Sequence, residues 1–150
     1  MGLDMYLMAK TRPIIKGIDV DKKFDVYNPS YIAFDIGYWR KANAIHRYFD
    51  SLVGGIENCQ DYDVSMESLQ KLKEICEKIL AASGRKQKAL AEELLPPQEG
   101  FFFGGTDLND KDILECYLED LKETIRIINL CEKFKEDTGG DCWFTYHAWW

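Results

Sequence analysis

The segment GYWRKANAIH, residues 37–46, brings together side chains suited to binding a small phosphorylated molecule. Apolar residues recur there at spacings of three and four, which predicts a helix from about 38 to 53. On such a helix an aromatic ring, an imidazole, an amide and two cations would lie on neighbouring faces. Aromatic rings stack on bases, and cationic side chains hold phosphates. The candidate ligand-binding residues of this segment are therefore Trp39, Arg40, Lys41, Asn43 and His46.

A purely structural interpretation of the same segment stays open. Trp39 could lap over the edge of the core, His46 could be a core residue with a satisfied hydrogen bond, and the cations could form a solvated face. In the helical interpretation, however, Arg40 and Lys41 face the positive end of the helix dipole. That placement costs roughly a few tenths of a kcal/mol at each position. A cost at two adjacent positions favours a ligand-binding role for the two cations.

Four further residues complete the candidate ligand-binding set: Phe102, Tyr117, Asp120 and Tyr146. Phe102 belongs to a phenylalanine run flanked by glycines, and Tyr117 and Asp120 belong to the predicted long helix. Tyr146 belongs to the aromatic C-terminal stretch. The run Phe101–Phe103 could instead pack in the core. Asp4 is expected to face the interior and to pair with Arg40 or Lys41, because a buried carboxylate needs such a partner.

No established catalytic motif is present. The sequence contains no nucleophile elbow, phosphate-binding loop, H-E-x-x-H pair or dinucleotide-binding fingerprint. We therefore name no catalytic residue, and a non-enzymatic protein is favoured. A small enzyme using His46 as acid or base, oriented by Asp4 or Asp120, is the third-ranked hypothesis. The only other histidine is His147.

The five cysteines show no paired spacing, so neither a metal site nor a cofactor is expected. They predict free thiols in a reducing cytosol, with those at 76, 116 and 131 acting as small apolar groups inside helices. The formal net charge of −7 opposes general binding to nucleic acids or to anionic membranes. No apolar run has the length of a signal peptide core or a membrane span.

Strands are predicted at both ends of the chain. Leu3, Met5 and Leu7 alternate with polar or amphipathic residues, which predicts a strand from near residue 2. The aromatic alternation of 142–149 predicts a docked final strand. Tyr31–Ile36 forms a third candidate strand, and residues 11–30 form short extended pieces around a turn at Lys22-Lys23.

Three further helices are expected: one beginning after Ser65 as N-cap, a shorter one over 88–95, and a long one over about 110–136. The fold class is α+β, with an antiparallel sheet that includes the N- and C-terminal strands and is covered by three or four helices. The length predicts a single domain over 1–150.

Five ordered motifs resemble a family of small, uncharacterised proteins encoded by tailed bacteriophages and prophages. They are MGLDMYL (1–7), GYWRKANAIH (37–46), LLPPQEGFFFG (94–104), Y-x-x-D-L-x-x-T (117–124) and the terminal YHAWW (146–150). The resemblance spans essentially the whole chain. It implies an accessory protein that acts in the bacterial host cytoplasm, and it supplies no activity, cofactor or catalytic residue.

The leading hypothesis is a phage or prophage accessory protein that binds a small phosphorylated ligand, a nucleotide or nucleotide signal, and thereby counters host defence. The alternative is an acidic inhibitor that docks on a host protein by mimicking nucleic-acid phosphates. Its docking surface would be the outer carboxylates Glu115, Glu119, Asp120 and Glu123. The oligomeric state is not assigned.

Overall fold

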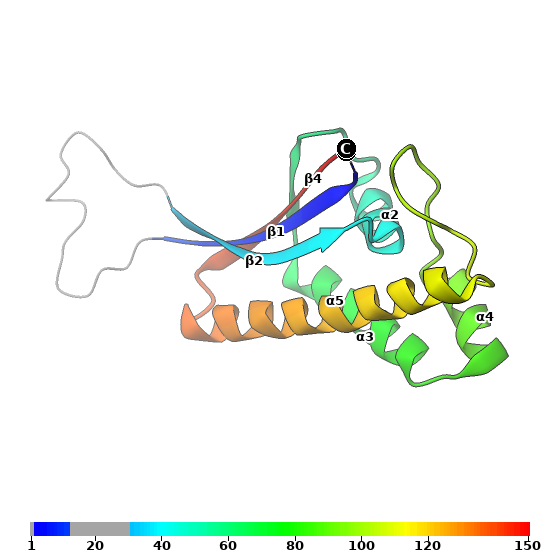
Figure 1. Ribbon diagram of the computed structural model, residues 1–150. Coiled ribbons are helices and arrows are strands. Elements are labelled where there is room, and N and C mark those ends of the chain that lie inside the picture. The colour runs from blue at the N-terminus through cyan, green and yellow to red at the C-terminus, as the bar shows by residue number, and fades with distance from the viewer. Residues whose placement is uncertain (1, 13–30) are drawn as a thin grey trace, which may run out of the picture.

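The computed structural model describes residues 2–12 and 31–150 and contains a four-stranded antiparallel sheet (Figure 1). The strand order is β2-β1-β4-β3. The strands are β1 (Asp4–Thr11), β2 (Ile32–Arg40), β3 (Asp61–Val64) and β4 (Cys142–Trp149). The predicted strands at both ends are confirmed, and they pair with each other at the centre of the sheet. The short strand β3 was not predicted, and the pieces predicted within 13–30 lie outside the described residues.

The helices are α2 (Asn43–Val53), α3 (Met66–Leu80), α4 (Gly84–Leu94) and α5 (Lys111–Asp137). Figure 1 shows α5 running beneath the strands, with α3 beside it and α4 at one end of the molecule. An antiparallel sheet with helices grouped on one face is an α+β fold, as predicted. In the part of the chain that the structure describes, no helix is long and apolar enough to cross a membrane.

The helix-covered face of the sheet carries the core. On β1, Met5 and Leu7 are fully buried, and Tyr146 and Ala148 are fully buried on β4. The alternation continues on the opposite, open face, where one cross-strand row runs through Tyr38, Tyr6, His147 and Asp61. The two-residue period of the terminal segments therefore fixes which side of the sheet the helices cover.

The helix predicted over 38–53 is wrong in its first turn. Strand β2 continues through Arg40, and α2 begins only at Asn43. Trp39 is 3% exposed and Tyr38 is 46% exposed, which is the strand alternation and the reverse of the predicted helical face. Lys41 then turns the chain with a φ of 59°, and its N–H donates to the carbonyl oxygen of Leu3.

A glycine sets the distance between the sheet and its longest helix. A Cβ added to Gly37 on β2 would lie only 2.5 Å from the side chain of Ile127 on α5. Any larger residue would force the strand and helix apart or displace a fully buried isoleucine.

The other helix boundaries follow local signals. Ser65 caps α3, and its hydroxyl accepts a hydrogen bond from the N–H of Ser68, as predicted. The long helix α5 matches its predicted range and is capped by Asp110. Helix α4 begins at Gly84, earlier than the predicted start at residue 88. The run Phe101–Phe103 forms a turn, in which Phe103 is buried and Phe101 is exposed.

Candidate functional site

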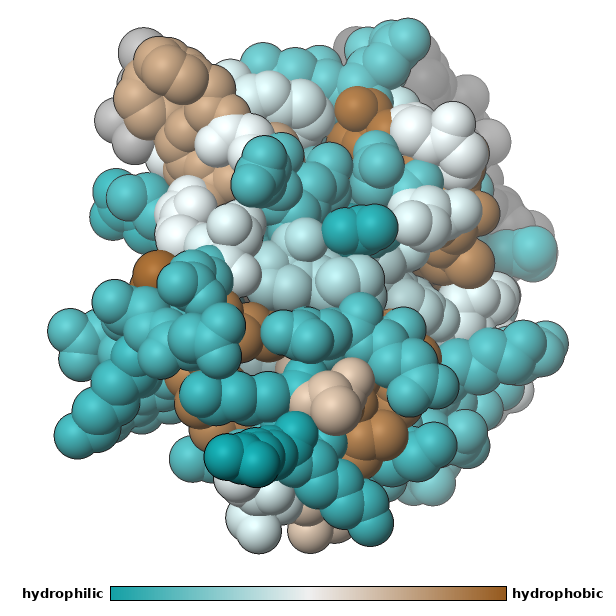
Figure 2. Space-filling view, turned by 90° about the vertical axis from the view of Figure 1, so that its right-hand side faces the viewer, coloured by the Kyte–Doolittle hydropathy of each residue, from teal (hydrophilic) through white to brown (hydrophobic). Residues whose placement is uncertain are grey.

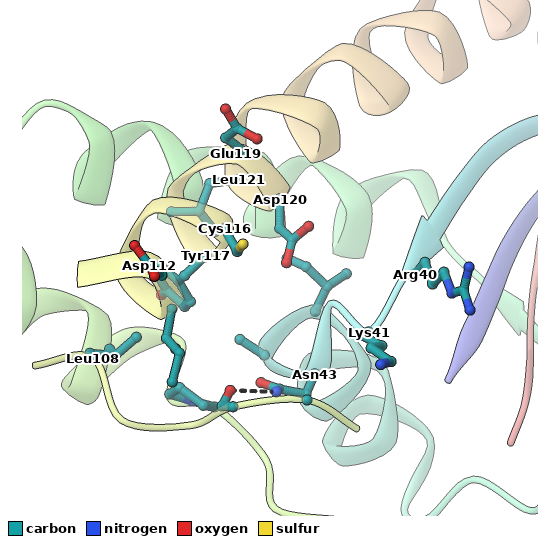
Figure 3. Close-up of a pocket in the computed structure, with 16 residues that line it drawn as sticks. Arg40, Lys41, Asn43, Leu108, Asp112, Cys116, Tyr117, Glu119, Asp120 and Leu121 are labelled. Carbon is teal, nitrogen blue, oxygen red and sulfur yellow. Dashed lines mark hydrogen bonds between the residues drawn. The ribbon is translucent and has the colours of Figure 1, made fainter. Parts of the chain in front are cut away.

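A cavity of about 410 Å³ lies between α5, the start of α2 and the loop that precedes α5 (Figure 3). Figure 2 views the end of the molecule that carries α2 and α4: its surface is mainly hydrophilic, with one hydrophobic projection at the upper left and other hydrophobic residues between polar ones. The apolar part of the lining is Ala44, Ile45, Pro97, Leu108, Ile113 and Leu121. The volume and mainly apolar lining are typical of small-molecule sites.

The α5 wall of the cavity carries carboxylates. Asp112 and Asp120 both line it, and Figure 3 shows the Asp120 carboxylate directed from α5 toward the cavity and α2. Glu119 also belongs to the lining, but its carboxylate turns outward in the same view. This wall therefore presents negative charge to one side of the cavity.

Asp120 lacks a counter-ion among the described residues. Within residues 2–12 and 31–150, no ion pair or hydrogen bond to its carboxylate is found. Burial, and secondarily the charge of Glu119, raise the pKa of Asp120 from 3.8 to about 7. A half-buried carboxylate of this kind attracts hydrogen-bond donors or cations from outside the protein.

The opposite rim of the cavity is basic. Arg40 is the last residue of β2 and Lys41 lies in the turn before α2, at the cavity edge in Figure 3. The Arg40 side chain points away from the cavity in that view. Lys41 is thus the cation better placed to meet a ligand.

Asn43 holds the loop that closes the cavity. Its side-chain nitrogen donates to the carbonyl oxygens of Phe103 at 3.1 Å and Gly105 at 3.0 Å. Both amide N–H groups are therefore used inside the protein. Asn43 lines the cavity as predicted, but it can offer a ligand only its oxygen atom.

His46 does not lie in the cavity, which corrects the prediction that it contacts a ligand. It is 1% exposed, and its Nδ1 lies 2.8 Å from the hydroxyl of Tyr146. Phe103 and Trp150 contact the imidazole edge-on, and Phe49 stacks on Tyr146 with ring centroids 4.1 Å apart. Burial lowers the pKa of His46, so the ring is neutral at pH 7. We call these five residues the aromatic cluster.

Two more candidates are structural or remote. Trp39 is buried, and its indole N–H donates to Thr124 Oγ1 at 2.9 Å, so it cannot stack on a ligand. Phe102 lies in an exposed turn with a φ of 69° and is not part of the cavity lining. Tyr117 does line the cavity, but its hydroxyl donates to the carbonyl oxygen of Leu95.

Of the nine predicted ligand-binding residues, the cavity therefore brings together Arg40, Lys41, Asn43, Tyr117 and Asp120. The structure places Trp39, His46, Phe102 and Tyr146 elsewhere. The prediction missed Asp112 and Cys116, which line the same wall. Asp112, Cys116 and Asp120 follow one another at intervals of four residues, which is a helical-face signal that was available in the sequence.

Asp4 also differs from its prediction. Its carboxylate accepts a hydrogen bond from the Tyr38 hydroxyl at 2.5 Å, on the open face of the sheet, and the described residues include no ion pair to Arg40 or Lys41. His147 lies on that face as well, with Nδ1 2.8 Å from Asp61. The two histidines thus lie on opposite faces of the sheet.

The cysteines are all free thiols. Burial raises the pKa of both Cys76 and Cys131 to about 12, so they remain neutral apolar groups. Cys116 is exposed, contrary to its prediction as a core residue. No group of three metal-ligating side chains occurs in the described part of the chain.

Comparison with protein-family models, with curated proteins and with solved structures finds no significant match to this chain.

Proposed function

We propose that this protein is a non-enzymatic binding protein whose cavity takes a small phosphorylated ligand, a nucleotide or nucleotide signal. The observation that carries the proposal is the separation of charge across one cavity. Lys41, from the turn between β2 and α2, lies at one rim of the cavity. The half-buried carboxylate of Asp120, which has no counter-ion among the described residues, lies on the opposite α5 wall.

This arrangement suits a ligand with an anionic end and a donor-rich end. Lys41 would hold a phosphate at the rim, as a flexible point charge does in other phosphate sites. Ile45, Leu108 and Ile113 would pack against a flat base. Asp112 and Asp120 would repel a phosphate from the α5 wall, so a nucleotide would enter in one orientation only.

The biological setting is proposed from the motif resemblance. Three of the motifs on which that resemblance rests, GYWRKANAIH, LLPPQEGFFFG and Y-x-x-D-L-x-x-T, each contribute residues to this cavity. A phage or prophage protein that sequesters a nucleotide signal in the bacterial cytoplasm would counter a host defence that depends on that signal.

The hypothesis that His46 acts as acid or base is disfavoured, because its ring is buried against Phe103 and Trp150 and lies outside the cavity lining. The docking hypothesis is weakened in two ways. Asp120 points into the cavity rather than outward, and Glu123 is already bonded to Arg126 at 2.6 and 2.8 Å.

The proposal is tested by thermal unfolding of the protein with a panel of mononucleotides and cyclic nucleotides, followed by titration calorimetry of any that stabilise it. A ligand at 100 times its dissociation constant adds about 2.7 kcal/mol to the free energy of unfolding. For this chain length the melting temperature should rise by roughly 5–10 °C.

Two variants make the result specific to the cavity. Lys41→Gln should weaken binding about tenfold or more, because a charge-assisted hydrogen bond is lost. Lys122→Gln removes an equal charge from an exposed position of α5 outside the cavity lining and should leave binding unchanged. A panel without any stabilising ligand would contradict the proposal.

A further inference from the structure

We propose that the cavity selects guanine among the nucleobases, with the Asp120 carboxylate accepting hydrogen bonds from the guanine N1–H and N2 amino group. This inference rests on the proposed function and specifies the ligand class of the same site.

The first step is that the protein itself leaves Asp120 without a donor. The two hydroxyls on the same side of α5 belong to Tyr117 and Thr124, three residues before and four after. The Tyr117 hydroxyl donates to the carbonyl oxygen of Leu95. The Thr124 hydroxyl donates to the backbone carbonyl oxygen of Asp120 at 2.7 Å and accepts from Trp39.

The amide of Asn43, across the cavity, is also committed, because it holds the loop at Phe103 and Gly105. No donor of the described residues reaches the Asp120 carboxylate, while Figure 3 shows that carboxylate directed into the cavity. The groups that satisfy it must come from water or from a ligand.

The second step is the chemistry of that carboxylate. When ionised it has two oxygen atoms that only accept hydrogen bonds, and it pairs best with two parallel donors. Guanine is the common base whose pairing edge presents two adjacent donors, N1–H and the N2 amino group. Adenine and cytosine place a ring-nitrogen acceptor beside their amino group, and uracil places its single N–H between two carbonyl oxygens. Each of these would bring a lone pair against a carboxylate oxygen.

The third step is the position of the charges. With guanine at Asp120 and its flat faces against the apolar residues of the lining, the phosphate of the same nucleotide extends toward the basic rim at Lys41. The opposite orientation would place phosphate against Asp112 and Asp120. One orientation thus satisfies both ends of the molecule.

The experiment is titration calorimetry at pH 8, above the Asp120 pKa of about 7, with the 5′-monophosphates of guanosine, inosine, xanthosine and adenosine. Inosine lacks only the N2 amino group, so its affinity should fall by roughly 10- to 100-fold relative to guanosine. The adenosine compound should bind at least about 100-fold more weakly, because an acceptor faces an acceptor.

The variant Asp120→Asn should exchange the preference. An amide presents one acceptor and one donor, which complements the N1–H and the C2 carbonyl of xanthine and opposes the guanine amino group. Guanosine monophosphate should therefore weaken and xanthosine monophosphate should become the better ligand. Glu115→Gln, on an exposed position of the same helix, should leave the wild-type order unchanged.

The outcomes separate this inference from the proposed function. Equal binding of all four nucleotides, with no effect of Asp120→Asn on their order, would overturn guanine selection and leave nucleotide binding intact. Absence of binding by every nucleotide would overturn both. The wild-type series decides the inference even if the variant fails to fold, since it needs no mutation.

Discussion

The aromatic cluster and the cavity both include residues of α2, but their polar groups differ in whether they find a partner within the protein. In the cluster, the hydroxyl of Tyr146 and the imidazole of His46 satisfy each other at 2.8 Å in a fully buried setting. In the cavity, the Asp120 carboxylate has no such partner among the described residues, and its pKa rises to about 7.

Residue type alone therefore does not distinguish a polar side chain with a structural role from one that is available to bind a ligand. His46, Trp39 and Tyr146 were all predicted to contact a ligand, yet a polar atom of each is hydrogen-bonded inside the protein. The carboxylate that the protein leaves unsatisfied is the stronger sign of a site, because a buried polar group without a partner costs free energy.

The largest expected effect falls on the cluster. Phe49→Ala removes a fully buried ring stacked on Tyr146 and should lower the free energy of unfolding by about 3–5 kcal/mol. Phe49 does not line the cavity, so nucleotide affinity of the folded protein should change less than threefold. Urea denaturation and calorimetry measure the two quantities. A loss below about 1 kcal/mol would show that the cluster is not tightly packed.

Asp120→Asn should instead raise the free energy of unfolding. In the unfolded chain Asp120 loses its proton near its ordinary pKa of 3.8, whereas in the folded protein it keeps the proton until about pH 7. The folded state binds more protons between these values, so Asp120 lowers stability as pH rises through that window. Removing it should raise the free energy of unfolding at pH 8 by roughly 2–3 kcal/mol, allowing for water in the cavity.

The matching measurement is urea denaturation of wild type and variant from pH 4 to pH 8. The charged groups around Asp120 are Asp112 and Glu119 on α5 and Lys41 at the opposite rim, and none of them changes in the comparison. The gain should shrink steadily toward pH 4. A gain that is independent of pH would mean that burial of the charge is not its cause.

A smaller loss is expected from Tyr146→Phe. The substitution keeps the ring stacked on Phe49 but leaves the buried Nδ1 of His46 without its partner, which costs about 1–2 kcal/mol. Urea denaturation at pH 8 measures the loss without interference from histidine protonation. An unchanged midpoint would indicate that water replaces the hydroxyl and that the cluster is less dry than the structure implies.

The smallest effect should come from Arg40→Gln. Its side chain points away from the cavity, so the free energy of unfolding should change by less than about 0.5 kcal/mol. Nucleotide affinity should fall less than threefold, in contrast to the loss expected for Lys41→Gln. A loss equal to that of Lys41→Gln would mean that Arg40 swings into the cavity when a phosphate binds.

Much of the fold was predictable because its terminal segments carry a plain two-residue period and its helices begin at good caps such as Ser65. The start of α2 was not, since apolar and polar residues over 38–42 fit both a strand and a helix. The pairing of β2 with β1 and the turn at Lys41 decided between them, and such tertiary contacts are not written in local spacing.

The candidate site was predictable in part for a related reason. Lys41 and Asp120 were both among the predicted ligand-binding residues, and both line the cavity. What the sequence could not show was which polar atoms would find partners within the protein. That depends on contacts such as Asn43 with the loop at Phe103, which join segments about 60 residues apart.

The strand order has a consequence for biosynthesis. Among the four strands, the central strand β1 is translated first, but its inner neighbour β4 is translated after the other three. At 5–20 residues per second, roughly 7–30 s pass before the pair can form. During that time the apolar side of β1 is covered at most in part. Deletion of residues 141–150 would remove β4 from the centre of the sheet, so it should lower the free energy of unfolding far more than loss of an edge strand of similar length.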